Sequence, residues 1–132
     1  MTEDIVTYLR ADATLTGYIG AGTSCRLYPN SAPKDPTVPY IVFRIQSDQG
    51  RTKGNQVRER LYGFSIFSET QLQAETIQRR LLVLLDKDES IVMPSDNYYI
   101  KSVWAGGGNS FKEDGTNLHH LSALFTFLFI EK

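Results

Sequence analysis

The sequence predicts an α+β fold of two layers, in which an antiparallel or mixed β-sheet of four to five strands packs against two main helices. Three patterns predict this class. Segments with alternating apolar residues form two hairpin-like pairs, an amphipathic segment with helical spacing separates the pairs, and a second amphipathic segment begins the chain. The expected order is therefore helix, short strand, strand, strand, helix, strand, strand.

Both expected helices begin with a capping signal. The first helix is expected from Glu3 to Leu9 or a little further, with Thr2 as its N-cap. The second follows Ser68-Glu69-Thr70-Gln71, which matches a capping box in which the serine hydroxyl accepts an amide hydrogen and the glutamine reaches back. Its apolar residues recur at helical spacing, and it should end near Lys87.

The earlier strands are separated by polar or glycine-rich segments. They are expected at Arg26–Pro29, Tyr40–Ser47, Val57–Phe67 and Tyr98–Ala105. Asp48–Gln56 is polar and contains two glycines, so it is predicted to be a long hairpin loop. Gly106–Thr116 is predicted to be a glycine-rich connection for the same reason.

The last segment, Asn117–Glu131, has the strongest strand pattern in the chain. Every second residue is apolar in the set Leu121, Ala123, Phe125, Phe127 and Phe129. The alternate set begins polar and becomes apolar at Leu124, Leu128 and Ile130. A strand that is apolar on both faces needs a layer on each side, so this chain supplies both layers or a neighbouring subunit supplies one. These three residues, with apolar residues of the other strands, are candidates for a subunit interface.

The composition is that of an ordinary globular protein. The 132 residues are expected to form a single domain, and the formal net charge of −1 argues against general electrostatic affinity for nucleic acid. The single cysteine, Cys25, excludes an intrachain disulfide and a cysteine-based zinc site, and we expect a buried free thiol. No signal peptide and no apolar run of about 20 residues is seen, so we expect a protein made in the cytoplasm and no membrane partner.

No motif specifies a reaction. Gly106-Gly107-Gly108 follows an expected strand, but neither the Lys-Thr pair nor the helix of a phosphate-binding loop comes after it. His119 and His120 are adjacent on a strand and should point to opposite faces, one towards solvent and one partly buried, which is poor geometry for shared metal ligation. We therefore predict no enzyme activity, no cofactor and no metal.

Positive charge is concentrated in one place only, at Arg51, Lys53, Arg58 and Arg60, with Asp48 and Glu59 nearby. No aromatic residue lies within this segment to stack against a base. Three interpretations stay open, namely a solvated surface, a contact with another protein and a contact with DNA. The four basic residues are therefore candidate interface residues.

The order of several short segments resembles one known family. The segments are Ala-Asp-Ala-Thr-Leu-Thr-Gly-Tyr-Ile-Gly after the first helix, then Arg26-Leu27-Tyr28-Pro29, a proline-rich loop, Pro39-Tyr40-Ile41-Val42-Phe43, a strand before a capped helix, and the terminal His-His-Leu-Ser-Ala-Leu-Phe-Thr-Phe strand. Together they resemble the tail-completion, or tail-terminator, proteins of long-tailed bacteriophages, over nearly the whole chain. The segment Gly106–Thr116 departs from that family by its many glycines.

The resemblance implies a structural virion protein at the head-tail junction, assembled in the host cytoplasm. Its partners would be copies of itself in a ring, six-fold in most members, the tail tube protein and the head-tail connector or stopper protein. Genome DNA would only pass through the channel of the ring. The family has no active-site residues to assign. Two alternatives remain, another joining or closure protein of the neck, and a small α+β module that binds nucleic acid through its sheet, where Tyr40, Tyr62, Tyr98 and Tyr99 lie.

Overall fold

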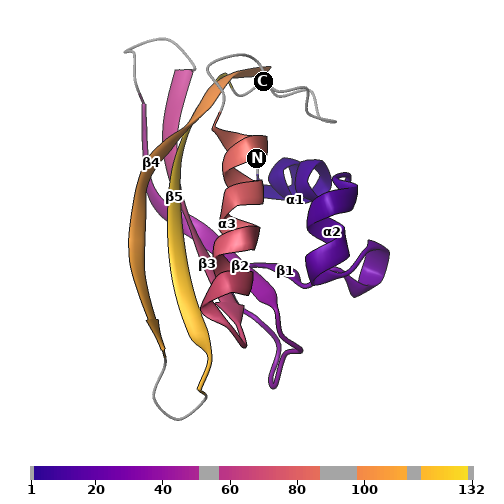
Figure 1. Ribbon diagram of the computed structural model, residues 1–132. Helices are drawn as coiled ribbons and strands as arrows, with labels where there is room; N and C mark the ends of the chain where they lie inside the picture. The colour runs from indigo at the N-terminus through magenta and orange to yellow at the C-terminus, as the bar shows by residue number, and fades with distance from the viewer. Residues whose placement is uncertain (1, 51–56, 87–97, 113–116, 131–132) are drawn as a thin grey trace.

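The computed structural model describes residues 2–50, 57–86, 98–112 and 117–130 (Figure 1). Its elements in chain order are α1 (Thr2–Arg10), α2 (Ala13–Ile19), a 3-10 turn (Gly22–Ser24), β1 (Leu27–Pro29), β2 (Tyr40–Gly50), β3 (Val57–Ser68), α3 (Gln71–Leu85), β4 (Tyr98–Lys112) and β5 (His119–Ile130).

The five strands form one mixed sheet in the order β1-β2-β3-β5-β4. β1 runs parallel to β2, and every other neighbouring pair is antiparallel. The helices lie together on one side of this sheet (Figure 1). The predicted α+β class is confirmed, with three α-helices in the described part instead of two. The extra helix is α2, which forms because Asp12 caps a new helix from its side chain after α1 has ended.

The core lies between the sheet and the helices. The predicted buried set of β5 is confirmed, since Leu121, Ala123, Phe125, Phe127 and Phe129 are all 6% exposed or less. The apolar side of α3 packs on β3 and β5 through Ala74, Ile77, Leu81, Leu84 and Leu85. Cys25 is a buried free thiol, as predicted.

α3 begins two residues later than the capping-box pattern predicts. Ser68 is still in β3, is fully buried and donates its hydroxyl to the carbonyl oxygen of Thr70 at 2.6 Å. Thr70 is the N-cap, because its Oγ1 accepts from the amide of Gln73 at 3.2 Å. The side chain of Gln71 donates to Glu75 instead of reaching back. The capping-box prediction is therefore wrong, and the helix cap is a single threonine.

Parts of two segments predicted to be loops continue the sheet, namely residues 48–50 and 106–112, while residues 51–56 and 113–116 lie outside the described residues. β2 runs to Gly50, and Asp48 pairs with Arg60 of β3. β4 runs through the glycines to Lys112, with register shifts between Trp104 and Gly106 and between Gly107 and Ser110. Gly106 has a φ of 135°, which L-residues with a side chain rarely adopt. These glycines lie at β-bulges in β4. The local sequence does not distinguish glycines at a bulge from glycines in a turn.

An ion pair and a hydrogen bond connect the N-terminal helices to α3. Arg80 donates from Nε and Nη2 to the two carboxylate oxygens of Asp12, at 2.9 and 2.5 Å. Asp12 also accepts from the amide of Leu15 at 2.8 Å. The hydroxyl of Tyr8 donates to the carbonyl oxygen of Leu84 at 2.9 Å. These contacts hold α1 and α2 against α3 on the helix side of the sheet.

Candidate functional site on the open face of the sheet

One face of the sheet is turned away from the helices, and none of the described helices covers it. We call it the open face. It carries the alternate residues of the three central strands, which are Tyr40, Val42 and Arg44 of β2, Leu61, Ser65 and Phe67 of β3, and His120, Ser122, Leu124, Thr126 and Leu128 of β5. Most of these side chains are only half-buried, in contrast to their buried neighbours on the helix side. The sheet therefore presents an apolar surface that this part of the chain leaves uncovered.

Aromatic rings form a row across the open face, at the end of the sheet where β3 finishes. Phe67 stacks on Tyr40 with ring centroids 4.8 Å apart and on His120 with centroids 4.6 Å apart. Tyr28 of β1 meets Tyr40 at 6.2 Å. The register produces this row, because Phe67 pairs directly with Tyr40 on one side and with His120 on the other. Tyr40 is only 9% exposed because its neighbours cover it.

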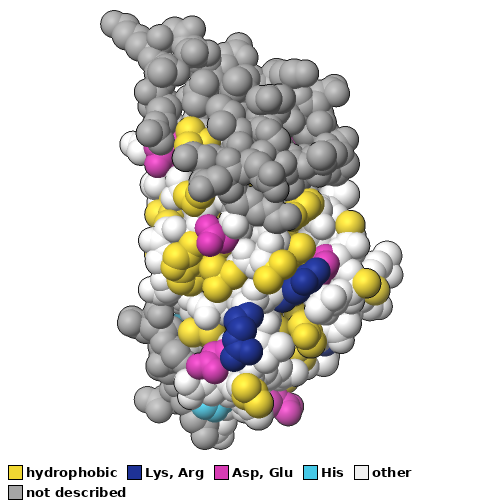
Figure 2. All heavy atoms as spheres, turned by 45° about the horizontal axis from the view of Figure 1, so that its top comes forward, with side chains coloured by type: hydrophobic (Ala, Val, Ile, Leu, Met, Phe, Trp, Pro, Cys, Tyr) yellow, Lys and Arg dark blue, Asp and Glu magenta, His cyan; other side chains and the backbone are white. Residues whose placement is uncertain are grey.

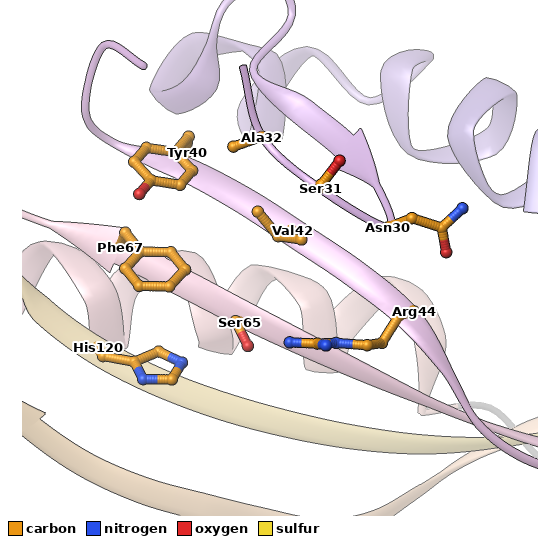
Figure 3. A pocket seen from close by; sticks show the side chains of 9 residues that line it. All are labelled: Asn30, Ser31, Ala32, Tyr40, Val42, Arg44, Ser65, Phe67 and His120. Carbon is orange, nitrogen blue, oxygen red and sulfur yellow. The ribbon is translucent and has the colours of Figure 1, made fainter. Parts of the chain in front are cut away.

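The aromatic row forms one wall of a groove of about 480 Å³, and the loop that follows β1 forms another wall. We call it the aromatic groove. Its lining residues are Asn30, Ser31, Ala32, Tyr40, Val42, Arg44, Ser65, Phe67 and His120. Figure 3 shows the three rings of Tyr40, Phe67 and His120 in line, with the side chain of Arg44 extending towards Ser65 and the helices behind the sheet. The amide of Asn30 donates to the carbonyl oxygen of Phe43 at 2.8 Å, and this bond fixes the loop beside β2.

The structure brings Arg58 and Arg60 together, but on the helix side of the sheet. Both guanidinium groups donate to Oδ2 of Asp48, Arg60 at 2.8 Å. Both also lie over the ring of Phe129, with distances of 5.7 Å from Arg58 and 5.3 Å from Arg60 to its centroid. These contacts give the two arginines a structural role at this end of the sheet.

The same contacts with Arg58 and Arg60 determine the pKa of Asp48. Burial raises the pKa of Asp48, but the hydrogen bonds from Arg60 and Arg58 outweigh it, so its pKa lies below the ordinary value. One charge of the predicted basic group is thus neutralised. Arg51 and Lys53 lie outside the described residues. On the side of the molecule shown in Figure 2, the Lys and Arg side chains lie close to Asp or Glu, and the described residues form no continuous basic surface there.

The apolar candidates of β5 lie where the alternation placed them. Leu124 and Leu128 are half-buried on the open face. Ile130 pairs through its backbone with Val57 and Tyr98, and its side chain is outside the described part. Sequence reasoning missed the groove, because Asn30, Ser31 and Ala32 belong to a loop without periodicity. Only the register places these residues beside Arg44 and His120.

The described residues contain no group of three or more His, Cys, Asp or Glu side chains that could hold a metal ion. His119 and His120 lie on opposite faces of β5, as predicted, and both are half-buried. His120 contributes its ring to the aromatic row. None of the described helices has the length and apolar character that a bilayer span requires. The chemistry that the open face offers is therefore aromatic and aliphatic contact, with the charge of Arg44.

Comparisons with known proteins give one informative result. No protein-family model matches the sequence. No curated protein matches it either. Among solved structures, the fold is similar to that of a chain from the virion of a native gene transfer agent particle, with a TM-score of 0.74, 12% sequence identity, and coverage of 99% of this chain and 95% of that one. A second solved chain has a TM-score of 0.57 at 12% identity, covering 100% of this chain and 99% of the other. At these identities the likeness establishes the fold alone.

Proposed function

We propose that this chain is a structural protein of a phage-like virion, and more specifically a tail terminator. It forms a ring on the head-proximal end of the tail tube, ends polymerisation of the tube and offers the surface to which the head joins. The observation that carries the proposal is the fold shared with a virion chain over 99% of the length. The sequence pattern described above resembles the tail-completion family independently of that comparison.

The open face supports a role in assembly. A ring requires a head-to-tail interface between two different surfaces of the same chain. Leu124 and Leu128 leave apolar surface half-buried on a sheet whose other side is already packed by helices. Such a surface gains free energy when a neighbouring subunit removes it from water, at roughly 25 cal/mol per Å² of apolar area.

The charge distribution supports a channel through which DNA passes without binding. Each phosphate contact made by a Lys or Arg adds salt-sensitive affinity. The net charge of the chain is −1, and Asp48 neutralises part of the Arg58 and Arg60 pair. A polymer that moves past such a surface meets little electrostatic retention.

The direct test uses tails produced without this protein. Purified protein is mixed with these tails, and negative-stain electron microscopy is used to look for a ring at one end of the tube. We expect a ring at the head-proximal end and a block to further addition of tube protein. Rings that bind isolated heads with their connector, and never tubes, would instead indicate another joining or closure protein of the neck.

A variant of the open face sharpens this test. Leu124→Ser with Leu128→Ser should remain folded by circular dichroism and lose the ring, because both side chains lie outside the core between sheet and helices. Val83→Ser is the matched control, since Val83 is 58% exposed on α3. If both variants form rings as the unmodified protein does, the open face has no part in assembly.

A further inference from the structure

We propose that the aromatic groove receives Leu72, at the start of α3, from a second copy of this chain, so that copies join head to tail. The inference rests on the proposed function, because it assigns two surfaces to the ring contact. It concerns a groove that the sequence pattern did not single out, and a residue, Leu72, that the helical pattern places on the apolar face of α3 but that is exposed in the structure.

Leu72 is the most exposed large apolar side chain in the described part of the chain. It is 69% exposed, compared with 58% for Val83 and 43% for Ile45. It stands at the rim of a hollow of about 450 Å³ between α2 and α3, whose other lining residues are Tyr18, Glu69, Thr70, Gln73 and Thr76. Leu72 lies on the first turn of α3, and its apolar side chain projects from a surface formed mainly by polar residues. The aromatic groove, with a volume of about 480 Å³, has room for a leucine side chain.

The two surfaces carry opposite charges. Arg44 lines the aromatic groove, and Glu69 lines the hollow beside Leu72. Both side chains are exposed, and among the described residues neither forms an ion pair. Two grooves facing each other would place Arg44 against Arg44, and two Leu72 surfaces would place Glu69 against Glu69. The charges therefore favour contact between unlike surfaces, which is the contact a ring needs.

Both surfaces lie at the same end of the sheet but on opposite sides of it. Phe67 forms part of the groove, and the chain then passes through Ser68 and Thr70 to reach Leu72 on the helix side. A contact between opposite sides leaves every copy with one free groove and one free Leu72. It therefore repeats until the rotation closes a ring.

The edges of the sheet are poor competitors for the same role. β1, one edge strand, has only three residues and ends in Pro29. β4, the other edge, has three register shifts along its pairing with β5. Short edge strands, proline and β-bulges all disfavour strand pairing between molecules. Pairing between sheet edges of two copies is therefore disfavoured in the described part.

Cysteine crosslinking tests the contact directly. The double variant Leu72→Cys with Ser65→Cys places one thiol on each surface, and the buried native Cys25 stays out of reach of oxidants. After mild oxidation of concentrated protein, and in parallel of protein bound to tail tubes, we expect a ladder of covalent oligomers that stops at the ring size. An equal mixture of the two single variants should give a heterodimer and no ladder. Val83→Cys with Ser65→Cys is the matched control and should give no ladder.

Charge reversal gives a second readout. Arg44→Glu should weaken self-association by about tenfold or more, and adding Glu69→Arg to the same chain should restore it. The thermal midpoint of each variant is measured as well, and we expect little change because both residues are exposed. Association of Arg44→Glu equal to that of the unmodified protein would overturn the charge pairing.

The results also separate this inference from the proposed function. Rings on tail tubes without a Leu72–Ser65 crosslink would contradict the docking contact and leave the tail-terminator role intact. A ladder in solution without any ring on tubes would support the contact and contradict that role. A crosslink from Leu72→Cys to the tube protein alone would show that Leu72 meets a different partner and would overturn the inference.

Discussion

Asp12 shows how one side chain serves two elements. Its carboxylate caps α2 by accepting from the amide of Leu15, and it binds the guanidinium of Arg80 on α3 through both oxygens. The hydrogen bond from Arg80 lowers the pKa of Asp12 below its ordinary value and outweighs the opposing effect of burial. The charged form is therefore the form that the folded state prefers.

Replacing Asp12 separates these two roles. Asp12→Ala removes the cap and the partly buried ion pair with Arg80, so it should lower the free energy of unfolding by about 1 to 2 kcal/mol at pH 7. Asp12→Asn keeps a capping oxygen and removes only the charge, so it should cost less. Urea titrations of the three proteins at several pH values provide the measurement.

The pH dependence has a definite sign. Because the pKa of Asp12 is lower in the folded state, its charge stabilises the protein above the unfolded pKa of about 3.9, and this contribution is lost as the pH falls through the folded value. The stability difference between the unmodified protein and Asp12→Asn should be constant from pH 7 to about pH 5 and shrink below about pH 4. A difference that grows on acidification would contradict the assignment.

At the scale of elements, α3 shows where local pattern and structure diverge. The sequence predicts Ser68 as the cap of this helix, whereas in the structure Thr70 is the N-cap. β3 keeps Ser68 because its backbone pairs with His119 of β5 and its side chain is fully buried. Because strand pairing keeps Ser68 in β3, the helix begins after Thr70, and Thr70 is its N-cap.

Two substitutions distinguish the observed cap from a capping box. Thr70→Ala should lower the free energy of unfolding by about 1 kcal/mol, because the amide of Gln73 loses its acceptor. Gln71→Ala should change it by less than about 0.5 kcal/mol, since the side chain of Gln71 is exposed and donates to Glu75 of the same helix. Chemical denaturation measures both. A larger loss for Gln71→Ala than for Thr70→Ala would favour the capping box.

At the scale of the whole molecule, the two faces of the sheet differ in burial. Its helix side is a closed core in which Phe127 packs edge-on against Tyr62 with centroids 5.3 Å apart. Its open face carries half-buried apolar side chains and the aromatic groove. Neighbouring residues of β5 thus lie in different environments, because successive side chains of a strand point to opposite faces.

Substitutions of Phe127 and Leu128 test this difference between the two faces within one strand. Phe127→Ala should lower the free energy of unfolding by about 3 to 5 kcal/mol, the usual cost of deleting a buried aromatic ring. Leu128→Ala should cost about 1 kcal/mol, since its side chain is only half-buried in the subunit. Thermal and urea unfolding of the isolated protein are the measurements. Equal losses would mean that the open face belongs to the core of the subunit.

The sequence by itself determined the five strands, the helices α1 and α3 and the phase of the core, but it missed α2 and the ends of β2 and β4. Alternation along β5 was sufficient to assign Phe125, Phe127 and Phe129 to the buried side, because the strand period is a local property of the chain. The helical spacing of the apolar residues in α3 was likewise sufficient to predict its buried side, because the helical period is also a local property of the chain. The resemblance to tail-completion proteins came from the order of such local segments.

Only the tertiary structure decided which of these surfaces meet. The aromatic row depends on the register that aligns Tyr40, Phe67 and His120, and the groove depends on a loop held to Phe43 by one hydrogen bond. The pairing of Asp48 with Arg58 and Arg60 likewise depends on the β2–β3 register. The register of these strands depends on contacts between residues far apart in the sequence. It therefore cannot be predicted from a local pattern alone.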